Sequence, residues 1–408
     1  MRRALLIFLG LLLTVVLSAQ TMTISVVGAR GGAYDVPWAL FAQQYPDVRV
    51  VHSDVDMKTG ETITMDALLA AGKDPDIYVD FVGRAAKYRV PQWAQALEID
   101  ESQYKPGTLD MYKTGNKLLG IPMAVPGQAL VIRIDVLERF RIDVPGDDWT
   151  INEFRSMARI VKSVGYWPTG LFAANPSGDY LYVNWFGAFG AKFYNSDYSR
   201  CTLDDARGLA AFRWLKELVD NEWVPPGPAM LTDDDYCATW QTGQIVAGPL
   251  RPSWVPSYMN PAVQSGILDK PMELQFIPFP HDPTLTAGSP TIGAGAAVIV
   301  HKTADRTKLR VLTDAAELLT GYYMQTISVS TEGFSPRADV TGMTSTPGQD
   351  VVNRIANRFG WLDVGYAQPW YYEVRAALPE ILGRMYNGRI TPEQAQREFV
   401  AAVNRLIR

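Results

Sequence analysis

The sequence predicts an α/β protein, because short β-prone runs alternate with segments of helical periodicity. Hydrophobic residues make up 47% of the 408-residue chain, which is enough to bury a large core. This length favours roughly two domains. Because alternating strands and helices build layered sheets, we expect mostly parallel sheets that are flanked by helices.

The predicted strands are runs of apolar and β-branched residues. They are Thr23–Val27, Val48–Val51, Asp76–Phe81, Ala129–Ile134, Glu273–Phe279 and Ala296–Val300. Helical patterns lie between the early strands, around Pro37–Gln44 and Thr62–Ala71. This alternation is the main support for the α/β assignment.

Explicit capping signals predict where two later helices begin. Thr150 and Glu153 have the spacing of a capping box, in which each side chain bonds to the other residue's backbone N–H. Thr391 and Gln394 have the same spacing, with Pro392 at the first helical position. We therefore expect helices to start directly after Thr150 and Thr391.

The N-terminus has the pattern of a secretory signal peptide over residues 1–19. Arg2 and Arg3 precede the apolar run Ala4–Leu17, and the small residues Ser18 and Ala19 follow it. No cysteine follows the run, so we expect no lipid anchor. The alternative is an uncleaved anchor. We expect a periplasmic or secreted protein.

The charge of the mature chain argues against nucleic acid as a partner. Loss of Arg2 and Arg3 leaves 36 basic residues against 43 acidic ones, a net charge of −7. Phosphate backbones are bound by clustered lysine and arginine, and this chain has no basic run. Its two cysteines, Cys201 and Cys237, are a candidate disulfide in an oxidising compartment, or else two buried free thiols.

The motifs of common catalytic and cofactor sites are missing from the sequence. His52, His281 and His301 are scattered and do not form a metal-binding pattern. There is no Gly-x-Ser-x-Gly elbow and no phosphate-binding loop. The aspartate clusters at 147–148, 204–205 and 233–235 precede apolar runs, so we interpret them as helix caps or solvated loops. We expect no metal, no cofactor and no catalysis.

The aromatic residues favour a carbohydrate ligand. The chain has 11 tryptophans, and Trp185, Trp254, Trp361 and Trp370 lie where apolar periodicity does not require them. A flat indole covers the C–H face of a pyranose, while polar side chains satisfy its hydroxyl groups. Other tryptophans, such as Trp214, are expected in the core.

Several motifs, in this order along the chain, resemble those of the family 1 extracellular solute-binding proteins of ABC importers, the group similar to maltose-binding proteins. The matching segments are Asp74–Tyr78, Lys117–Pro122, Asp148–Phe154, Trp240–Gly248, Gly333–Arg337 and Ala367–Arg375, followed by Gly388–Thr391. Trp370 and Tyr371 are similar to the family's Trp-Tyr segment, which supplies aromatic stacking to a glucose unit. Leu119 stands where the family usually has an aromatic residue.

The resemblance implies two α/β lobes with a ligand cleft between them and a hinge that closes over the ligand. One lobe would hold residues 20–124 plus 284–335, and the other 125–283 plus 336–408. The protein would be a monomer that delivers a carbohydrate to the permease subunits of an ABC importer, and an oligosaccharide is the carbohydrate expected.

The expected ligand-binding residues come from the resemblance and from position. Trp370, Tyr371 and Trp254 follow from the resemblance. Other residues are expected in the site because they follow the ends of predicted strands, where α/β proteins bind their ligands. These residues are Arg30, Tyr34, Asp54, Asp80 and Arg84. Trp185, Gln128 and Arg337 complete the set.

Two alternatives remain open from the residues. The first is a carbohydrate-active enzyme of the cell envelope. The second keeps the fold but binds a peptide, a polyamine or a ferric ion. Tyrosine pairs at 322–323 and 371–372 are compatible with iron binding. Two points argue against it: Tyr322 and Tyr323 are expected on an apolar helical run, and a hard cation is normally coordinated by carboxylate or histidine as well.

Overall fold

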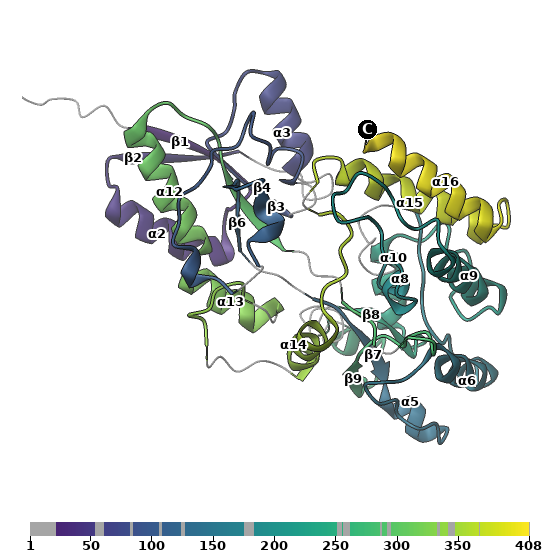
Figure 1. Cartoon of the computed structure of the whole chain (residues 1–408). Coiled ribbons are helices and arrows are strands. Elements are labelled where there is room, and N and C mark those ends of the chain that lie inside the picture. Colours follow the sequence, from purple (N-terminus) through teal and green to yellow (C-terminus); the bar gives the residue numbers. More distant parts are fainter. Residues whose placement is uncertain are drawn as a thin grey trace, which may run out of the picture.

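The computed structural model describes residues 22–53, 61–81, 85–105, 108–123, 127–174, 183–250, 255, 262–285, 288–291, 295–332, 335–341, 347–366 and 368–407. These residues form two lobes that lie side by side (Figure 1). The predicted signal peptide lies outside the described residues. None of the described helices combines the length and apolar content that a membrane crossing requires.

The first lobe is built on a five-stranded sheet with strand order β2-β1-β3-β10-β6. These strands are β1 (Met22–Val27), β2 (Val48–Ser53), β3 (Ile77–Phe81), β6 (Ile121–Pro122) and β10 (Ala296–Val300). The lobe also holds η1 (Gly32–Tyr34), α2 (Asp35–Gln44), α3 (Glu61–Ala70), α12 (Arg306–Thr320) and α13 (Tyr322–Glu332), with the short strands β4 (Lys113–Thr114) and β5 (Lys117–Leu118). The four strands and two helices predicted here are confirmed.

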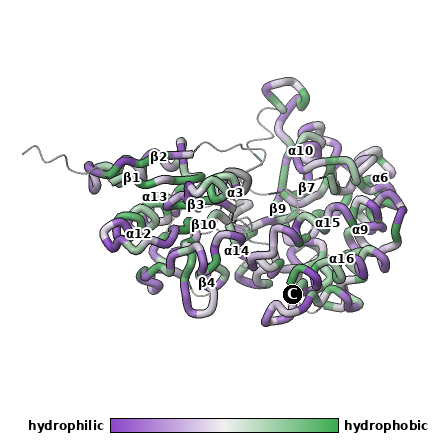
Figure 2. Tube along the Cα trace, turned by 90° about the horizontal axis from the view of Figure 1, so that it is seen from above, coloured by the Kyte–Doolittle hydropathy of each residue, from purple (hydrophilic) through white to green (hydrophobic). Residues whose placement is uncertain are grey.

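The second lobe has a three-stranded sheet with order β8-β7-β9 among the described residues. Its strands are β7 (Ala129–Arg133), β8 (Ala247–Leu250) and β9 (Leu274–Ile277). Its helices are α5 (Ile134–Arg139), α6 (Ile151–Ser163), α8 (Asn184–Ala188), α9 (Ala206–Asp220), α10 (Asp233–Gln241), α14 (Pro347–Phe359), α15 (Tyr371–Tyr386) and α16 (Pro392–Leu406). Figure 2 shows hydrophilic and hydrophobic colour alternating along α6, α9 and α16, as expected for helices that cover a core.

Strand direction differs in part from the expected mostly parallel sheets. β1 is parallel to β2 and β3, but β10 is antiparallel to β3, and β7 is antiparallel to both β8 and β9. The reason is the path of the chain. It enters the second lobe along β7 and returns along β9, so those strands run in opposite directions. β10 then leads away from the crossing, against β3.

Both predicted capping boxes are present. The Thr150 hydroxyl accepts from the Glu153 N–H while Glu153 bonds back, and Thr391 and Gln394 do the same at α16. The aspartate clusters also have local roles. Asp205 caps α9, Asp235 completes a capping box with Thr232 at α10, and Asp147 and Asp148 form ion pairs with Arg354 and Arg358.

The candidate disulfide is not formed: Cys201 and Cys237 are both buried and are not bonded to each other. Cys201 pairs with Tyr194 across a turn, whereas Cys237 lies on the buried side of α10. Burial raises the pKa of the Cys201 thiol to about 11, so it stays protonated at neutral pH.

The segments that cross between the lobes are joined by buried hydrogen bonds. The Thr291 hydroxyl donates to the Gln128 carbonyl oxygen at 2.6 Å and accepts from the Gln128 N–H at 3.0 Å. The Gln128 side-chain oxygen accepts from the Asn184 amide at 2.6 Å. A third segment pairs here too, since the Leu362 N–H donates to the Thr291 carbonyl at 2.8 Å.

We predict that Thr291→Val lowers the free energy of unfolding by ~1–3 kcal/mol, because it leaves buried backbone groups of Gln128 unpaired. Urea denaturation followed by circular dichroism measures the loss. The matched control is Thr307→Val on the exposed face of α12, which should stay within about 0.5 kcal/mol of wild type. Equal midpoints for the two variants would contradict the importance of the crossing bonds.

Candidate functional site

Polar and aromatic side chains of the first lobe follow the carboxyl ends of its parallel strands. Arg30 is exposed and Tyr34 half-buried after β1, and Asp80 is buried on β3, where it accepts a hydrogen bond from the Tyr78 hydroxyl. Because β1 and β3 are parallel, these groups share one edge of the sheet. In Figure 1 β1 runs from the outer side of its lobe toward the second lobe.

Close backbone packing fixes the segment after β1. Gly28 has φ of 97°, and a Cβ there would lie 2.1 Å from the Val79 carbonyl oxygen, so only glycine fits. The Trp38 indole N–H donates to the Ala29 carbonyl at 2.7 Å. These contacts hold the chain just before Arg30, so its position at the sheet edge is determined by the fold.

His52, at the end of β2, belongs to the same edge. Its ring lies edge-on to Trp38 with centroids 5.3 Å apart. Burial lowers the pKa of His52, and the positive charge of Arg30 lowers it further. The imidazole is therefore neutral at pH 7.

The aromatic part of the second lobe centres on Trp370. This residue precedes α15, is half-buried, and packs on Tyr194 with ring centroids 5.0 Å apart. Gly365 lies against both rings, since a Cβ there would come within 2.8 Å of Tyr194 and 3.3 Å of Trp370. The indole is thus supported by packing, and the residue keeps part of its surface in solvent.

The first turn of α15 lies close to the first lobe. Burial and a 2.7 Å hydrogen bond to Asp66 raise the pKa of Tyr88, and the neighbouring Asp80 and Tyr372 raise it further. An electrostatic effect of this kind requires proximity. Tyr372 follows Trp370 by two residues, so the segment that carries Trp370 leads into the turn of α15 that lies near Tyr88.

Not every predicted site residue belongs to this arrangement. Trp185 is fully buried between Phe154, Trp214 and Phe279, so it is a core residue and we remove it from the site. Tyr371 is 2% exposed and packs on Tyr366, so it is a packing residue beneath the Trp370 region and does not itself face solvent.

Gln128 and Arg337 have structural partners elsewhere. Gln128 is 2% exposed in the crossing described above. Arg337 was expected in the second lobe, but the adjoining backbone pairs with the first, where Lys105 N–H donates to Pro336. Its guanidinium pairs with Asp339 and lines a first-lobe cavity of about 350 Å³. Asp54, Arg84 and Trp254 lie outside the described residues, so their roles stay predictions.

The sequence reasoning missed three residues beside Trp370: Tyr194, Tyr198 and Asp363. The Tyr198 hydroxyl donates to Asp363 at 2.6 Å, and Tyr194 lies between Tyr198 and Trp370. The available signal was a pair of tyrosines four residues apart in a polar segment, which has no helical or strand periodicity. Only the fold brings this segment to Trp370.

The described residues offer no group of three or more histidine, cysteine, aspartate or glutamate side chains that could hold a metal ion. The tyrosine pair at 322–323 begins helix α13, as expected, and is 53% and 39% exposed. Two α/β lobes joined by short crossings, with polar strand ends in one lobe and a partly exposed indole in the other, define a solute-binding protein of the two-lobed periplasmic type.

Comparison with known proteins identifies the family. The model of the family described as bacterial extracellular solute-binding protein matches residues 27–320, and the chain belongs to this family. No match is found among curated protein sequences.

Solved structures share the fold at low sequence identity. An ABC transporter solute-binding protein from Thermotoga lettingae, bound with alpha-D-tagatose, is 18% identical and has a TM-score of 0.74 over 95% of this chain and 100% of its own. A maltose-bound protein of T. maritima is 18% identical, with a TM-score of 0.75 over 94% and 100%. A chitin oligosaccharide binding protein is 15% identical, with a TM-score of 0.75 over 95% and 100%.

We predict that Arg30→Gln raises the pKa of His52, because it removes the cation that opposes imidazole protonation. The chain has three histidines, so a proton NMR titration can resolve each ring. His301, whose pKa is lowered mainly by burial, is the internal control and should not move. A His52 pKa unchanged from wild type would contradict the placement of Arg30.

The same histidines set the sign of a pH effect on stability. In the folded protein the pKa values of His52 and His301 both lie below the ordinary histidine pKa of about 6.5. As pH falls through 6.5, the unfolded chain therefore binds protons first and folding stability decreases. Urea midpoints should be lower at pH 5.5 than at pH 7.5, and His301→Phe should reduce that difference. A midpoint that is higher at pH 5.5 would contradict these shifts.

Proposed function

We propose that this chain captures a carbohydrate between its lobes, without chemically altering it, and delivers it to the membrane permease of an ABC importer. The observation that carries the proposal is the half-buried Trp370, which packs on Tyr194 and Gly365 just before the turn of α15 whose Tyr372 lies near Tyr88 of the first lobe. A preformed, partly exposed indole suits the C–H face of a pyranose. Membership of the solute-binding family supports the transport role.

The ligands named for similar structures support a sugar. Those proteins bind tagatose, maltose and chitin oligosaccharide, according to their descriptions. The polar groups at the first lobe's strand ends, Arg30, Tyr34 and Asp80, would satisfy hydroxyl groups once the hinge closes. We propose export to the periplasm or the medium and action as a monomer.

The proposal is tested by a thermal-shift screen of mono- and oligosaccharides, followed by calorimetry. A ligand at a hundred times its Kd adds ~2.7 kcal/mol to folding stability, which is readily detected. Chromatography of the incubated sugar then separates a binder from an enzyme. Stoichiometric recovery of intact ligand is the expected result, whereas turnover would establish the enzyme alternative and binding of ferric ion or peptide alone would overturn the sugar.

We predict that Trp370→Ala weakens binding of the cognate sugar by ~1–3 kcal/mol, the value of burying an aromatic anchor. Trp167→Ala is the matched control, because Trp167 is also half-buried in the second lobe but lies beside Ile245. Calorimetry on both variants, each checked for folding by circular dichroism, gives the comparison. An unchanged Kd for Trp370→Ala would remove this residue from the site.

A further inference from the structure

A hairpin of the second lobe extends the aromatic surface beyond Trp370. The Tyr198 and Tyr194 rings have centroids 5.9 Å apart, and those of Tyr194 and Trp370 are 5.0 Å apart. We call these three residues the aromatic ledge. Tyr194 is 7% exposed, whereas Tyr198 and Trp370 are only half-buried, so the ledge offers two rings to solvent with a packed ring between them.

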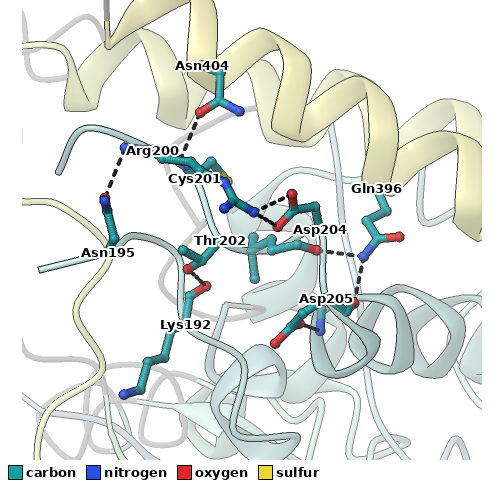
Figure 3. Close-up of polar contacts among 11 residues, drawn as sticks. Lys192, Asn195, Arg200, Cys201, Thr202, Asp204, Asp205, Gln396 and Asn404 are labelled. Carbon is teal, nitrogen blue, oxygen red and sulfur yellow. Dashed lines mark hydrogen bonds and ion pairs between the residues drawn. The ribbon is translucent and has the colours of Figure 1, made fainter.

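The base of the hairpin is firmly anchored to α16. Figure 3 shows the Asn404 side-chain oxygen accepting from the Cys201 N–H at 2.8 Å. Gln396 donates to the carbonyl oxygens of Leu203 at 2.6 Å and Asp205 at 2.8 Å. A ledge held in this way is a fixed surface, as binding without a large ordering cost requires.

Tyr198 has a backbone conformation that a tyrosine rarely adopts. Its φ is +57°, and the only other described non-glycine residues with positive φ are Arg141 and Glu222. Those two directly follow the ends of α5 and α9, where left-handed residues are common. Tyr198 lies in a hairpin turn, a place that ordinarily takes glycine or asparagine, and such exceptions cluster at functional sites.

The turn itself does not need the tyrosine side chain. The Asn195 side-chain oxygen accepts from the Arg200 N–H at 2.9 Å, and its amide donates to Ser199 at 2.9 Å. Asp197 accepts from the Ser199 N–H at 3.1 Å. These bonds close the turn through its own polar side chains. The ring of Tyr198 is therefore an addition to the turn.

Asp363 supplies the polar half of the arrangement. One carboxylate oxygen accepts from the Tyr198 hydroxyl at 2.6 Å and the other from the Gly365 N–H at 2.9 Å. Asp363 is exposed, and each carboxylate oxygen has a further lone pair. Half-burial and this carboxylate raise the pKa of Tyr198, so its phenol stays a donor at neutral pH.

We propose that Tyr198 and Asp363 form an outer sugar subsite, which binds a further pyranose of an oligosaccharide whose first ring stacks on Trp370. The inference rests on the proposed function. Tyr198 would cover the C–H face of the outer ring, and Asp363 would accept from its hydroxyl groups. The subsite selects for length, so a monosaccharide or disaccharide does not use it.

The test measures affinity against ligand length. The probes are α-1,4-linked glucose oligomers and β-1,4-linked N-acetylglucosamine oligomers of two to five units, titrated by calorimetry. Wild-type affinity should rise with length. Tyr198→Asn removes the ring but tolerates positive φ, so the fold is kept. It should weaken the longest bound oligomer by about tenfold and the shortest by less than about twofold.

Matched variants make the outcome unambiguous. Asp363→Asn should also act on long oligomers only, and Trp370→Ala should act on every length. Tyr322→Ala, an exposed tyrosine of α13 in the other lobe, should change nothing. Oligomers that bind with no dependence on length, or a loss in Tyr198→Asn that is equal at all lengths, would overturn the subsite alone. If wild type binds no oligomer, the subsite is overturned, while the proposed function is decided separately by the screen of mono- and oligosaccharides.

Discussion

The hydrogen bonds between Gln128 and Thr291 are the interaction on which the two-lobed structure depends. The segments that contain Gln128 and Thr291 are joined by these bonds, and residues 360–362 pair with Thr291 as well. Three segments that are far apart in the sequence therefore meet at one small buried network. Such a network is costly to leave half-satisfied, so it holds together the segments that lie between the two sheets.

The candidate site combines polar groups of the first lobe with aromatic rings of the second lobe. The parallel strands of the first lobe end in polar groups, while the second lobe contributes rings that its core cannot fully cover. Trp370 differs from Trp185 in this respect, because Trp185 is enclosed by Phe154, Trp214 and Phe279 whereas Trp370 packs on Tyr194 and is only half-buried. Partial burial is what distinguishes a binding surface from packing.

Much of the fold could be predicted from local patterns. Strands and capped helices depend on neighbouring residues, so β1, β3 and the boxes at Thr150 and Thr391 are where the sequence placed them. Strand direction in the second lobe could not be predicted, since it depends on the path of the chain between lobes. The burial of Trp185 and of the two thiols depends on tertiary packing, as does the meeting of Tyr194 with Trp370 across 176 residues of sequence.

The central claim is that an indole surface between two lobes holds a sugar and leaves it intact. A crystal structure of the chain grown with its tightest-binding saccharide tests this most directly. The account predicts a pyranose ring stacked on the Trp370 indole, with its glycosidic bonds whole and polar groups of the first lobe closed over it. A ligand bound elsewhere, or a cleaved product in the site, would contradict it.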